Sequence, residues 1–245
     1  MAQTKDLLNF GKDALATKDI SPVDAELILA HFLGVSRMDL HSREIEIEDE
    51  TIAEQYKHAI ADRLTGKPTQ YITGSAPFRY LDYEVGPGVL IPRPETEVMV
   101  DEVLHQISSM PDPISIVDLG AGAGGISIAL ATETHSKKEV HVIAVEKSKD
   151  ALAWLRKNIQ KHEVNIRVIE DSAANALQGI KCDVVVANPP YLPDGQPIPQ
   201  ELNFEPDMAL FGGPGNGMRD PIEFIQAAAR LLKSGGLLAM EHNEV

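Results

Sequence analysis

The fold of this chain is decided by the stretch Val117-Asp118-Leu119-Gly120-Ala121-Gly122-Ala123-Gly124-Gly125. It follows a short apolar run of β type that begins at Ile114, and it opens a segment with a helical pattern. Three of its glycines satisfy the G-x-G-x-x-G pattern, in which glycine lets the backbone approach a ligand closely. The stretch therefore predicts a strand–loop–helix unit whose loop binds a ligand; the alternative is a tight turn that binds none.

Further β-like runs continue along the chain from this stretch. They cover residues 114–118, 140–145, 166–169, 182–187 and 236–240. Helical patterns lie between most of them, as at residues 148–162 and 221–232. Such alternation is typical of βαβ units, and it predicts an α/β fold: a doubly wound, Rossmann-like parallel sheet with helices on both faces.

The beginning of the chain has a different pattern. Ser21-Pro22-Val23-Asp24 combines a capping residue, a proline at the first helical position and an acid at the third. A second helix is predicted from about Thr51 to Gly66, whereas residues 71–89 carry aromatics, Gly and Pro that favour a short hairpin. We therefore expect a small helical bundle over residues 1–72, a hairpin and linker over 73–89, and the α/β domain over 90–245.

Composition excludes several classes of protein. The net charge of −15 over 245 residues argues against a large phosphate-binding surface, because neutralising phosphates needs clustered Lys and Arg. No apolar run approaches the roughly 18 residues of a membrane span, and charges interrupt any signal peptide. The single cysteine, Cys182, fits a reducing cytoplasm. These features predict a cytoplasmic protein with a small-molecule or protein partner, and neither nucleic acid nor membrane binding.

Asn188-Pro189-Pro190-Tyr191 directly follows the predicted strand at 182–187. Ligands of open α/β sheets bind at the carboxyl ends of strands. Two consecutive prolines fix φ and remove two N–H donors, so the carbonyls of Asn188 and Pro189 can point outward as acceptors. Asn188 adds a side-chain carbonyl, and Tyr191 adds a flat apolar face. Such a pocket suits a planar group with two N–H donors, which is an amide or an exocyclic amine. The alternative is that the tetrapeptide is only a rigid turn.

The loop over residues 188–217 is long and rich in Pro and Gly, which is typical of functional or mobile segments.

Carboxylates near the strand ends are candidates for binding a cofactor, and the charge of one of them indicates which cofactor. A pyrophosphate would lie near the helix N-terminus, yet Asp118 precedes the first glycine by two residues, where its charge would repel a diphosphate. It would suit a cationic ligand such as S-adenosylmethionine, which carries a sulfonium and an ammonium. Glu146 ends the second strand, where an acid can accept the ribose hydroxyls of either cofactor. Asp171, after the third strand, could accept from an adenine amine or cap a helix. We predict S-adenosylmethionine as cofactor, S-adenosylhomocysteine as its product, and no metal.

These motifs in this order resemble those of the bacterial release-factor glutamine N5-methyltransferases, the HemK/PrmC family. The resemblance runs along nearly the whole chain. Its most specific part is Leu90-Ile91-Pro92-Arg93-Pro94-Glu95-Thr96-Glu97; by physics alone Arg93-Pro94-Glu95 would be only a stiff turn holding an ion pair. Residues 63–74 resemble the stretch between the family's two domains. The family's methyltransferase motifs are matched by residues 118–124, 144–146 and 188–191. The pattern that follows the last of these motifs is matched by Glu205-Pro206, Ala209-Leu210 and Gly212-Gly213.

The resemblance implies methyl transfer from S-adenosylmethionine to the side-chain amide nitrogen of a glutamine, in the Gly-Gly-Gln loop of peptide chain release factors. It gives catalytic roles to Asn188, Pro189 and Tyr191, with Pro190, Arg93 and Glu95 also contacting the substrate. The cofactor would be bound by Asp118, Gly120, Ala121, Gly122, Ala123, Gly124, Glu146, Asp171, Ser172 and Asn188. The helical domain and the long loop would hold the protein substrate, and we expect a monomer.

Three departures from the family pattern affect these expectations. The family usually has Asp where this chain has Glu146, and often a bulky residue that stacks on adenine where this chain has Ser172. The family fold continues past the fifth strand with a helix and a hairpin that complete a seven-stranded sheet. This C-terminal hairpin is expected to be missing here, which would leave part of the sheet as an unprotected edge.

Other functions remain open at this level. A ribosomal-protein glutamine methyltransferase is a close relative that sequence separates poorly. A DNA or RNA amino-methyltransferase also acts on a planar N–H pair, but it must extract a base from its stack and bind the backbone. The chain shows no basic stripe for such binding. From a different class, a nonenzymatic binding protein would use the same pocket without turnover.

Overall fold

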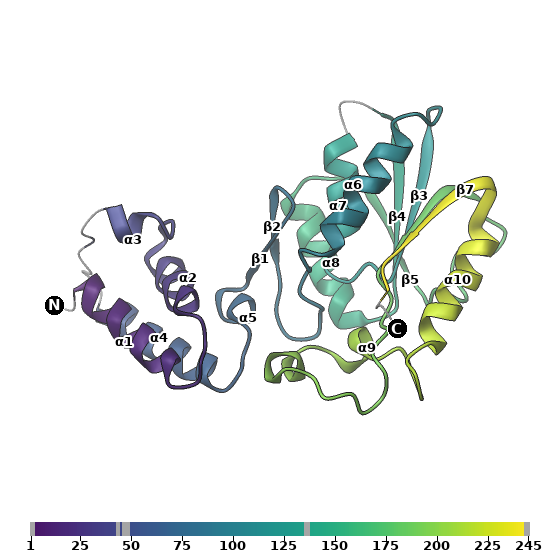
Figure 1. Ribbon diagram of the computed structural model, residues 1–245. Coiled ribbons are helices and arrows are strands. Elements are labelled where there is room, and N and C mark those ends of the chain that lie inside the picture. The colour runs from purple at the N-terminus through teal and green to yellow at the C-terminus, as the bar shows by residue number, and fades with distance from the viewer. Residues whose placement is uncertain (1–2, 43–44, 46–49, 135–137, 243–245) are drawn as a thin grey trace. The chain divides into compact units, whose positions relative to one another are not determined.

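A computed structural model describes residues 3–42, 45, 50–134 and 138–242. The chain forms two compact units (Figure 1). The first comprises Met1–Gly74 together with Pro199–Phe204, and the second comprises Ser75–Ile198 together with Glu205–Val245. The chain therefore passes between the units at three places, two of them within the long loop that follows Asn188.

The first unit is helical. Its elements are α1 (Thr4–Ala16), α2 (Pro22–Leu33), α3 (Asp39–Ser42), α4 (Glu50–Leu64), α5 (Thr69–Thr73) and the 3-10 turn η1 (Gln200–Phe204). The capping prediction is confirmed, since the Ser21 side chain accepts a hydrogen bond from the Val23 N–H at 3.3 Å. Gly34 ends α2 in the left-handed conformation that glycine favours, with φ of 64°. Apolar residues from α1, α2 and α4 form the core, among them Leu15, Ile28, Leu29, Tyr56 and Ile60.

The segment Pro199–Phe204 is anchored in this helical unit by polar contacts. The Arg63 guanidinium is almost fully buried and pairs with Asp24 at 2.7 Å and with Glu201. The Gln200 side-chain amide donates to the Thr65 carbonyl at 2.8 Å. A Cβ at Gly66 would lie 2.7 Å from the Gln200 side chain, so glycine is needed for this close approach.

The second unit is the predicted α/β fold. A hairpin of β1 (Ser75–Phe78) and β2 (Leu81–Glu84) precedes a parallel sheet of order β5-β4-β3-β6-β7. Its strands are β3 (Ile114–Leu119), β4 (Val140–Glu146), β5 (Ile166–Glu170), β6 (Cys182–Ala187) and β7 (Leu232–Met240). The helices are α6 (Thr96–Ile107), α7 (Gly125–Thr134), α8 (Lys149–Lys161), α9 (Asp207–Leu210) and α10 (Arg219–Leu231). No helix in the described part of the chain is both long and apolar enough to cross a membrane.

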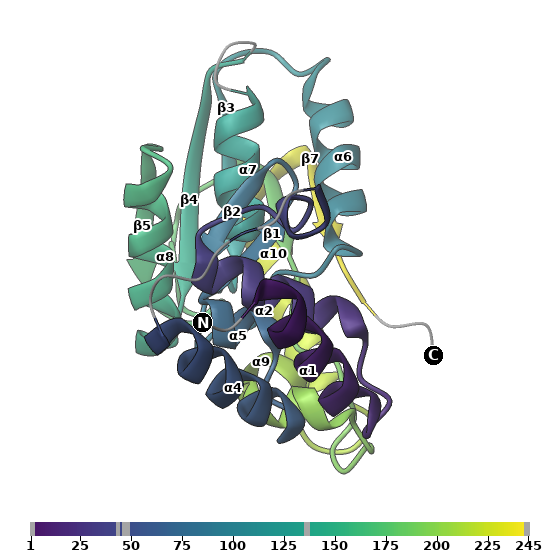
Figure 2. The same cartoon turned by 90° about the vertical axis from the view of Figure 1, so that its left-hand side faces the viewer.

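Helices cover both faces of the sheet, as the alternating pattern predicts. Val117 and Leu119 of β3 pack with Phe224 and Leu231 of α10 in one buried cluster. The opposite face is covered by α6, α7 and α8, and Figures 1 and 2 show α6 and α7 side by side. Residues of one strand alternate between the two faces, so each strand is buried on both and reads as a nearly continuous apolar run.

The strand order places the loops that bear the motifs at one point. The chain runs from β3 to β4 and β5 on one side of the sheet, then returns to β6 and β7 on the other side. β3 and β6 are therefore neighbours, with Leu119 opposite Ala187 at their carboxyl ends. Such a reversal of strand order opens a crevice in which ligands of doubly wound sheets bind. The glycine loop and Asn188 flank this crevice.

The last strand begins earlier than the sequence pattern indicates. We predicted a helix to Leu232 and a strand over 236–240, but α10 ends at Leu231 and β7 begins at Leu232. The pairing with β6 is irregular here, because Cys182 pairs with Leu232 and Val184 with Leu237. Gly235, with φ of 78°, allows the turn that accommodates the extra residues.

Candidate functional site

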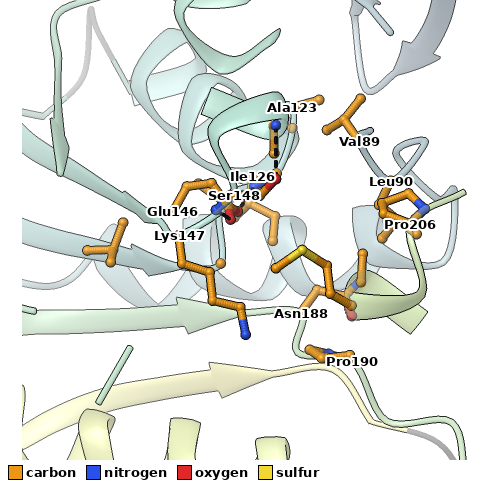
Figure 3. A pocket seen from close by; sticks show the side chains of 18 of the residues that line it. Val89, Leu90, Ala123, Ile126, Glu146, Lys147, Ser148, Asn188, Pro190 and Pro206 are labelled. Carbon is orange, nitrogen blue, oxygen red and sulfur yellow. Dashed lines mark hydrogen bonds between the residues drawn. The ribbon is translucent and has the colours of Figure 1, made fainter. Parts of the chain in front are cut away.

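A cavity lies at the carboxyl ends of the parallel strands in the α/β unit (Figure 3). Its walls come from residues 120–123 after β3, residues 146–148 at the end of β4, Asp171 after β5, and Asn188 and Pro190 after β6. Parts of the segments 88–96 and 206–209 close the remaining sides. The motifs singled out in the sequence thus meet at one cavity.

The glycines of the loop serve different purposes. Gly120, Gly122 and Gly124 all have positive φ, at 73°, 56° and 91°. A Cβ at Gly124 would lie 2.7 Å from the Leu155 side chain, so this glycine permits close packing of α7 against α8. A Cβ at Gly122 would meet nothing within 4 Å. Gly122 therefore borders open space in the cavity, where the backbone can contact a ligand.

Glu146 holds the glycine loop from the end of β4. One carboxylate oxygen accepts from the Gly122 N–H at 2.9 Å and the other from the Ser148 N–H at 2.8 Å. The side chain is buried yet lines the cavity, as Figure 3 shows. Each carboxylate oxygen has a second lone pair, so Glu146 can still accept from a ligand's hydroxyls.

Asp118 lies beneath the glycine loop and does not line the cavity. It is fully buried, and one carboxylate oxygen accepts from the Ser127 N–H in the first turn of α7 at 3.1 Å. The other oxygen has no hydrogen-bond partner within the described residues. Burial raises the pKa of the Asp118 carboxyl to about 7, against the opposing effect of the Ser127 hydrogen bonds.

Asp171 and Ser172 have separate roles. Asp171 lines the cavity, and one of its carboxylate oxygens accepts from the Ser172 N–H at 2.8 Å. The Ser172 hydroxyl accepts from the Asn175 N–H at 3.3 Å and thus caps the following turn. Ser172 is not among the residues that line the cavity.

The Leu90–Glu97 signature is fixed by Glu205, a residue that we did not predict to belong to the site. The Glu205 side chain is 1% exposed; it accepts from the Ile91 N–H at 2.9 Å and pairs with Arg93 at 2.5 Å. The ion pair of Arg93 is therefore with Glu205 rather than with Glu95, which is exposed and does not line the cavity. This contact joins two stretches that lie more than a hundred residues apart in the sequence.

Asn188 belongs to a hydrogen-bond network at the cavity wall. Its side-chain NH₂ donates to the Thr96 hydroxyl at 3.1 Å, and that hydroxyl donates to the Glu241 carboxylate at 2.5 Å. The Tyr191 hydroxyl donates to the other oxygen of Glu241 at 3.4 Å. Burial, together with the Glu241 carboxylate, raises the pKa of Tyr191. Thr96 and Glu241 were not predicted as site residues.

The loop after Asn188 is closed at its base. The N–H groups of Tyr191 and Leu192 both donate to the Leu210 carbonyl, at 3.2 and 2.9 Å, and the Gly212 N–H donates to the Leu192 carbonyl at 3.0 Å. A Cβ at Gly212 would lie 1.9 Å from the Gly217 carbonyl oxygen, so only glycine fits there. The structure thus holds both ends of this long loop together.

The cavity gathers only part of the predicted site. Lining it are Arg93, Gly120, Ala121, Gly122, Ala123, Glu146, Asp171, Asn188 and Pro190. Outside its lining lie Glu95, Asp118, Gly124, Ser172, Pro189 and Tyr191. The lining also includes Lys147 and Glu223, which no sequence motif marked; Figure 3 shows Lys147 beside Glu146.

Comparison with known proteins gives consistent matches. The PrmC N-terminal domain matches residues 6–74, and the methyltransferase small domain matches residues 97–202. The release factor glutamine methyltransferase of Streptomyces coelicolor is 38% identical over 230 residues, which cover 89% of this chain and 76% of that protein. The Escherichia coli protein of that name is 34% identical over 223 residues, covering 89% and 78%. The solved Thermus thermophilus 16S rRNA N2 G1207 methyltransferase aligns with a TM-score of 0.48 and 21% identity, over 67% of this chain and 40% of that chain.

With a glycine loop, a strand-end acid and Asn188 around one crevice, the protein is an S-adenosylmethionine-dependent methyltransferase. The long matches to curated relatives define it further. The chain belongs to the release factor glutamine methyltransferase family.

The cavity has the acceptor groups that such a cofactor needs. Its lining carries three carboxylates, those of Glu146, Asp171 and Glu223, but only two cations, Lys147 and Arg93. Of these cations, Arg93 is already paired with Glu205. The lining is therefore acidic, which suits a cationic ligand and disfavours a diphosphate. The open space above Gly122 provides room beside the loop. The residues present fit S-adenosylmethionine.

Proposed function

We propose that this protein methylates the side-chain amide nitrogen of the glutamine in the Gly-Gly-Gln motif of peptide chain release factors. Curated relatives that share 34–38% identity with most of this chain carry the name release factor glutamine methyltransferase. The observation that carries the proposal is the position of Asn188, which lies at the end of β6 on the wall of the same cavity as the glycine loop.

The cofactor would be held mainly by Glu146, by the backbone of residues 120–123 and by Asp171. When bound, S-adenosylmethionine supplies a methyl group that its sulfonium makes electrophilic. Glu146 would accept from the ribose hydroxyls with the lone pairs that Gly122 and Ser148 leave unused. Asp171 would accept from the adenine amine. The Glu146 carboxylate contacts both the glycine loop and the start of α8.

An amide nitrogen is a poor nucleophile because resonance withdraws its lone pair into the carbonyl. The Asn188 side-chain oxygen and the Pro189 carbonyl would each accept one of the two amide hydrogens. This pairing would orient the nitrogen lone pair towards the methyl group and favour the positive charge that develops on nitrogen. Tyr191 would pack against the plane of the amide. Arg93, Glu95 and Pro190 would contact the rest of the protein substrate.

We further propose that the enzyme acts as a cytoplasmic monomer on a protein rather than on nucleic acid. The net charge of −15 supports a protein substrate over nucleic acid, since a polyanion would be repelled at most of the surface. Within the cavity lining, Lys147 is the one cation besides Arg93. A DNA or RNA amino-methyltransferase, which must bind a phosphate backbone, is therefore disfavoured.

The test is methyl transfer from radiolabelled S-adenosylmethionine to a purified release factor. We expect one methyl group on the glutamine of Gly-Gly-Gln, located by mass spectrometry, and no labelling once that glutamine is replaced. Ribosomal proteins, DNA and RNA serve as competing substrates under the same conditions. Label that enters one of these competitors, with none in the release factor, would overturn the proposed substrate.

A further inference from the structure

Building on the proposed reaction, we infer that Thr96 and Glu241 are positioning residues that set the orientation of the Asn188 side-chain amide. They hold its NH₂ group away from the substrate, so that its carbonyl oxygen faces the target glutamine. Neither residue is required to touch the cofactor or the reacting nitrogen to have this effect. Thr96 would act through Asn188 alone, whereas Glu241 also contacts the Tyr191 hydroxyl.

The direction of each hydrogen bond in the network follows from the chemistry of the groups. A carboxylate can only accept, so the Thr96 hydroxyl must donate its hydrogen to Glu241, at 2.5 Å. The hydroxyl then offers only lone pairs to its other neighbour. The Asn188 atom 3.1 Å away must therefore be the NH₂ nitrogen and not the carbonyl oxygen. The orientation of the Asn188 amide therefore follows from its hydrogen-bond partner, although its oxygen and nitrogen have nearly the same shape.

Thr96 and Glu241 are themselves held in place by the backbone. Thr96 is 4% exposed, and its N–H donates to the Arg93 carbonyl at 3.1 Å at the start of α6. Glu241 follows β7, and its N–H donates to the carbonyl of Ala187 at 3.0 Å. Ala187 is the residue directly before Asn188. Asn188 is therefore connected to Ala187 twice, once by the peptide bond and once through the hydrogen bonds of Thr96 and Glu241.

Tyr191 supports the same arrangement from the other side. Its hydroxyl lies 3.4 Å from the second oxygen of Glu241, so the carboxylate faces two hydroxyl donors. Burial and the charge of Glu241 raise the pKa of Tyr191, which keeps its hydroxyl protonated and able to donate. Glu241 thus links the first and the last residue of Asn-Pro-Pro-Tyr.

The orientation decides whether the pocket can hold a primary amide. Within the described residues, no group donates to the Asn188 side-chain oxygen, and Asn188 lines the cavity. In the orientation set by Thr96, this acceptor is available to an N–H of the substrate. In the reverse orientation, an NH₂ donor would face the NH₂ donor of the target, and the contact would be lost.

The test is a mutant cycle between Thr96 and Asn188, with release-factor methylation as the assay. Thr96→Val removes the hydroxyl and leaves the amide free to turn, so we expect kcat to fall about 10- to 100-fold, on the scale of outer-shell positioning effects. The Kd for S-adenosylmethionine should stay within about 2-fold. Thr96→Ser, which keeps the hydroxyl, should restore most of the turnover. Thr134→Val is the matched control, because its buried hydroxyl donates to the Leu130 carbonyl within α7 and lies outside the cavity lining.

The decisive comparison is made in the Asn188→Ala background under single-turnover conditions. A residue that acts through Asn188 has nothing left to orient there, so Thr96→Val should cause no further loss. An equal fractional loss in both backgrounds would overturn the inference, as would unchanged kcat in Thr96→Val alone. If Thr96→Val does not fold, Thr96→Ala, which also removes the hydroxyl, replaces it with the same expectations. A wild-type enzyme that binds S-adenosylmethionine but does not label the release factor would refute the proposed function instead.

Discussion

Replacing Glu146 by Gln should weaken both the glycine loop and the binding of S-adenosylmethionine. Glu146 accepts two backbone hydrogen bonds, from Gly122 at 2.9 Å and from Ser148 at 2.8 Å. A Gln side chain of the same size offers only one oxygen, so its NH₂ would face one of these N–H donors. Hydrogen bonds to charged groups contribute roughly 1.5–3 kcal/mol each, and we expect the free energy of unfolding to fall by about that amount.

The same substitution removes one of the acceptors proposed for the ribose hydroxyls. A loss of about 1.5–3 kcal/mol in binding corresponds to a Kd for S-adenosylmethionine that rises roughly 10- to 150-fold. Isothermal titration calorimetry measures the Kd, and urea denaturation without cofactor measures stability separately. Glu170→Gln is the matched control, since Glu170 is the register partner of Glu146 on β5 but lies outside the cavity lining. An unchanged Kd in Glu146→Gln, or an equal rise in both variants, would refute the reasoning.

Three further predictions concern other parts of the site. Gly124→Ala should destabilise the fold by about 1–3 kcal/mol, because its methyl group would lie 2.7 Å from Leu155, whereas Gly122→Ala should chiefly weaken cofactor binding; thermal melting and calorimetry separate the two effects. Asn188→Ala should keep most cofactor affinity but lose roughly 10²–10³ in kcat, and full turnover in steady-state assays would contradict its role. The pKa of Asp118 is raised to about 7 in the folded state, so its protonation stabilises the fold below pH 4 and this contribution is lost as pH rises to about 7. Asp118→Asn should flatten that part of the stability–pH curve in urea denaturation, and an unaltered slope would exclude Asp118 as its source.

The sheet and the positions of its loops could be predicted because their signals are local. Runs such as Cys182–Ala187 are apolar on both faces, and the glycines after Leu119 mark the turn into α7. The start of β7 was placed too late, because Lys233-Ser234-Gly235-Gly236 resembles a loop and the irregular pairing with β6 depends on tertiary contacts.

The connections around Asn188 could not be predicted in the same way. Thr96 lies 92 residues from Asn188 and 145 residues from Glu241 in sequence, and no periodic pattern joins them. Glu205 lies 112 residues from Arg93. Each of these side chains is an ordinary polar residue until the fold brings its partner within reach. The family signatures contained Thr96 and Glu205, but a signature does not say which residues bond to each other.

The closed base of the loop after Asn188 has a consequence for protein engineering. Leu192 is fixed by its bonds to Leu210 and Gly212, and Pro199–Phe204 is anchored separately in the helical unit. Between these anchors, residues 194–197 are exposed, and Gly195 has open space around it. Lengthening a flexible segment costs only about 0.6 kcal/mol for each doubling of its length. We therefore expect a short flexible insertion at Gly195 to leave the folds of both units intact.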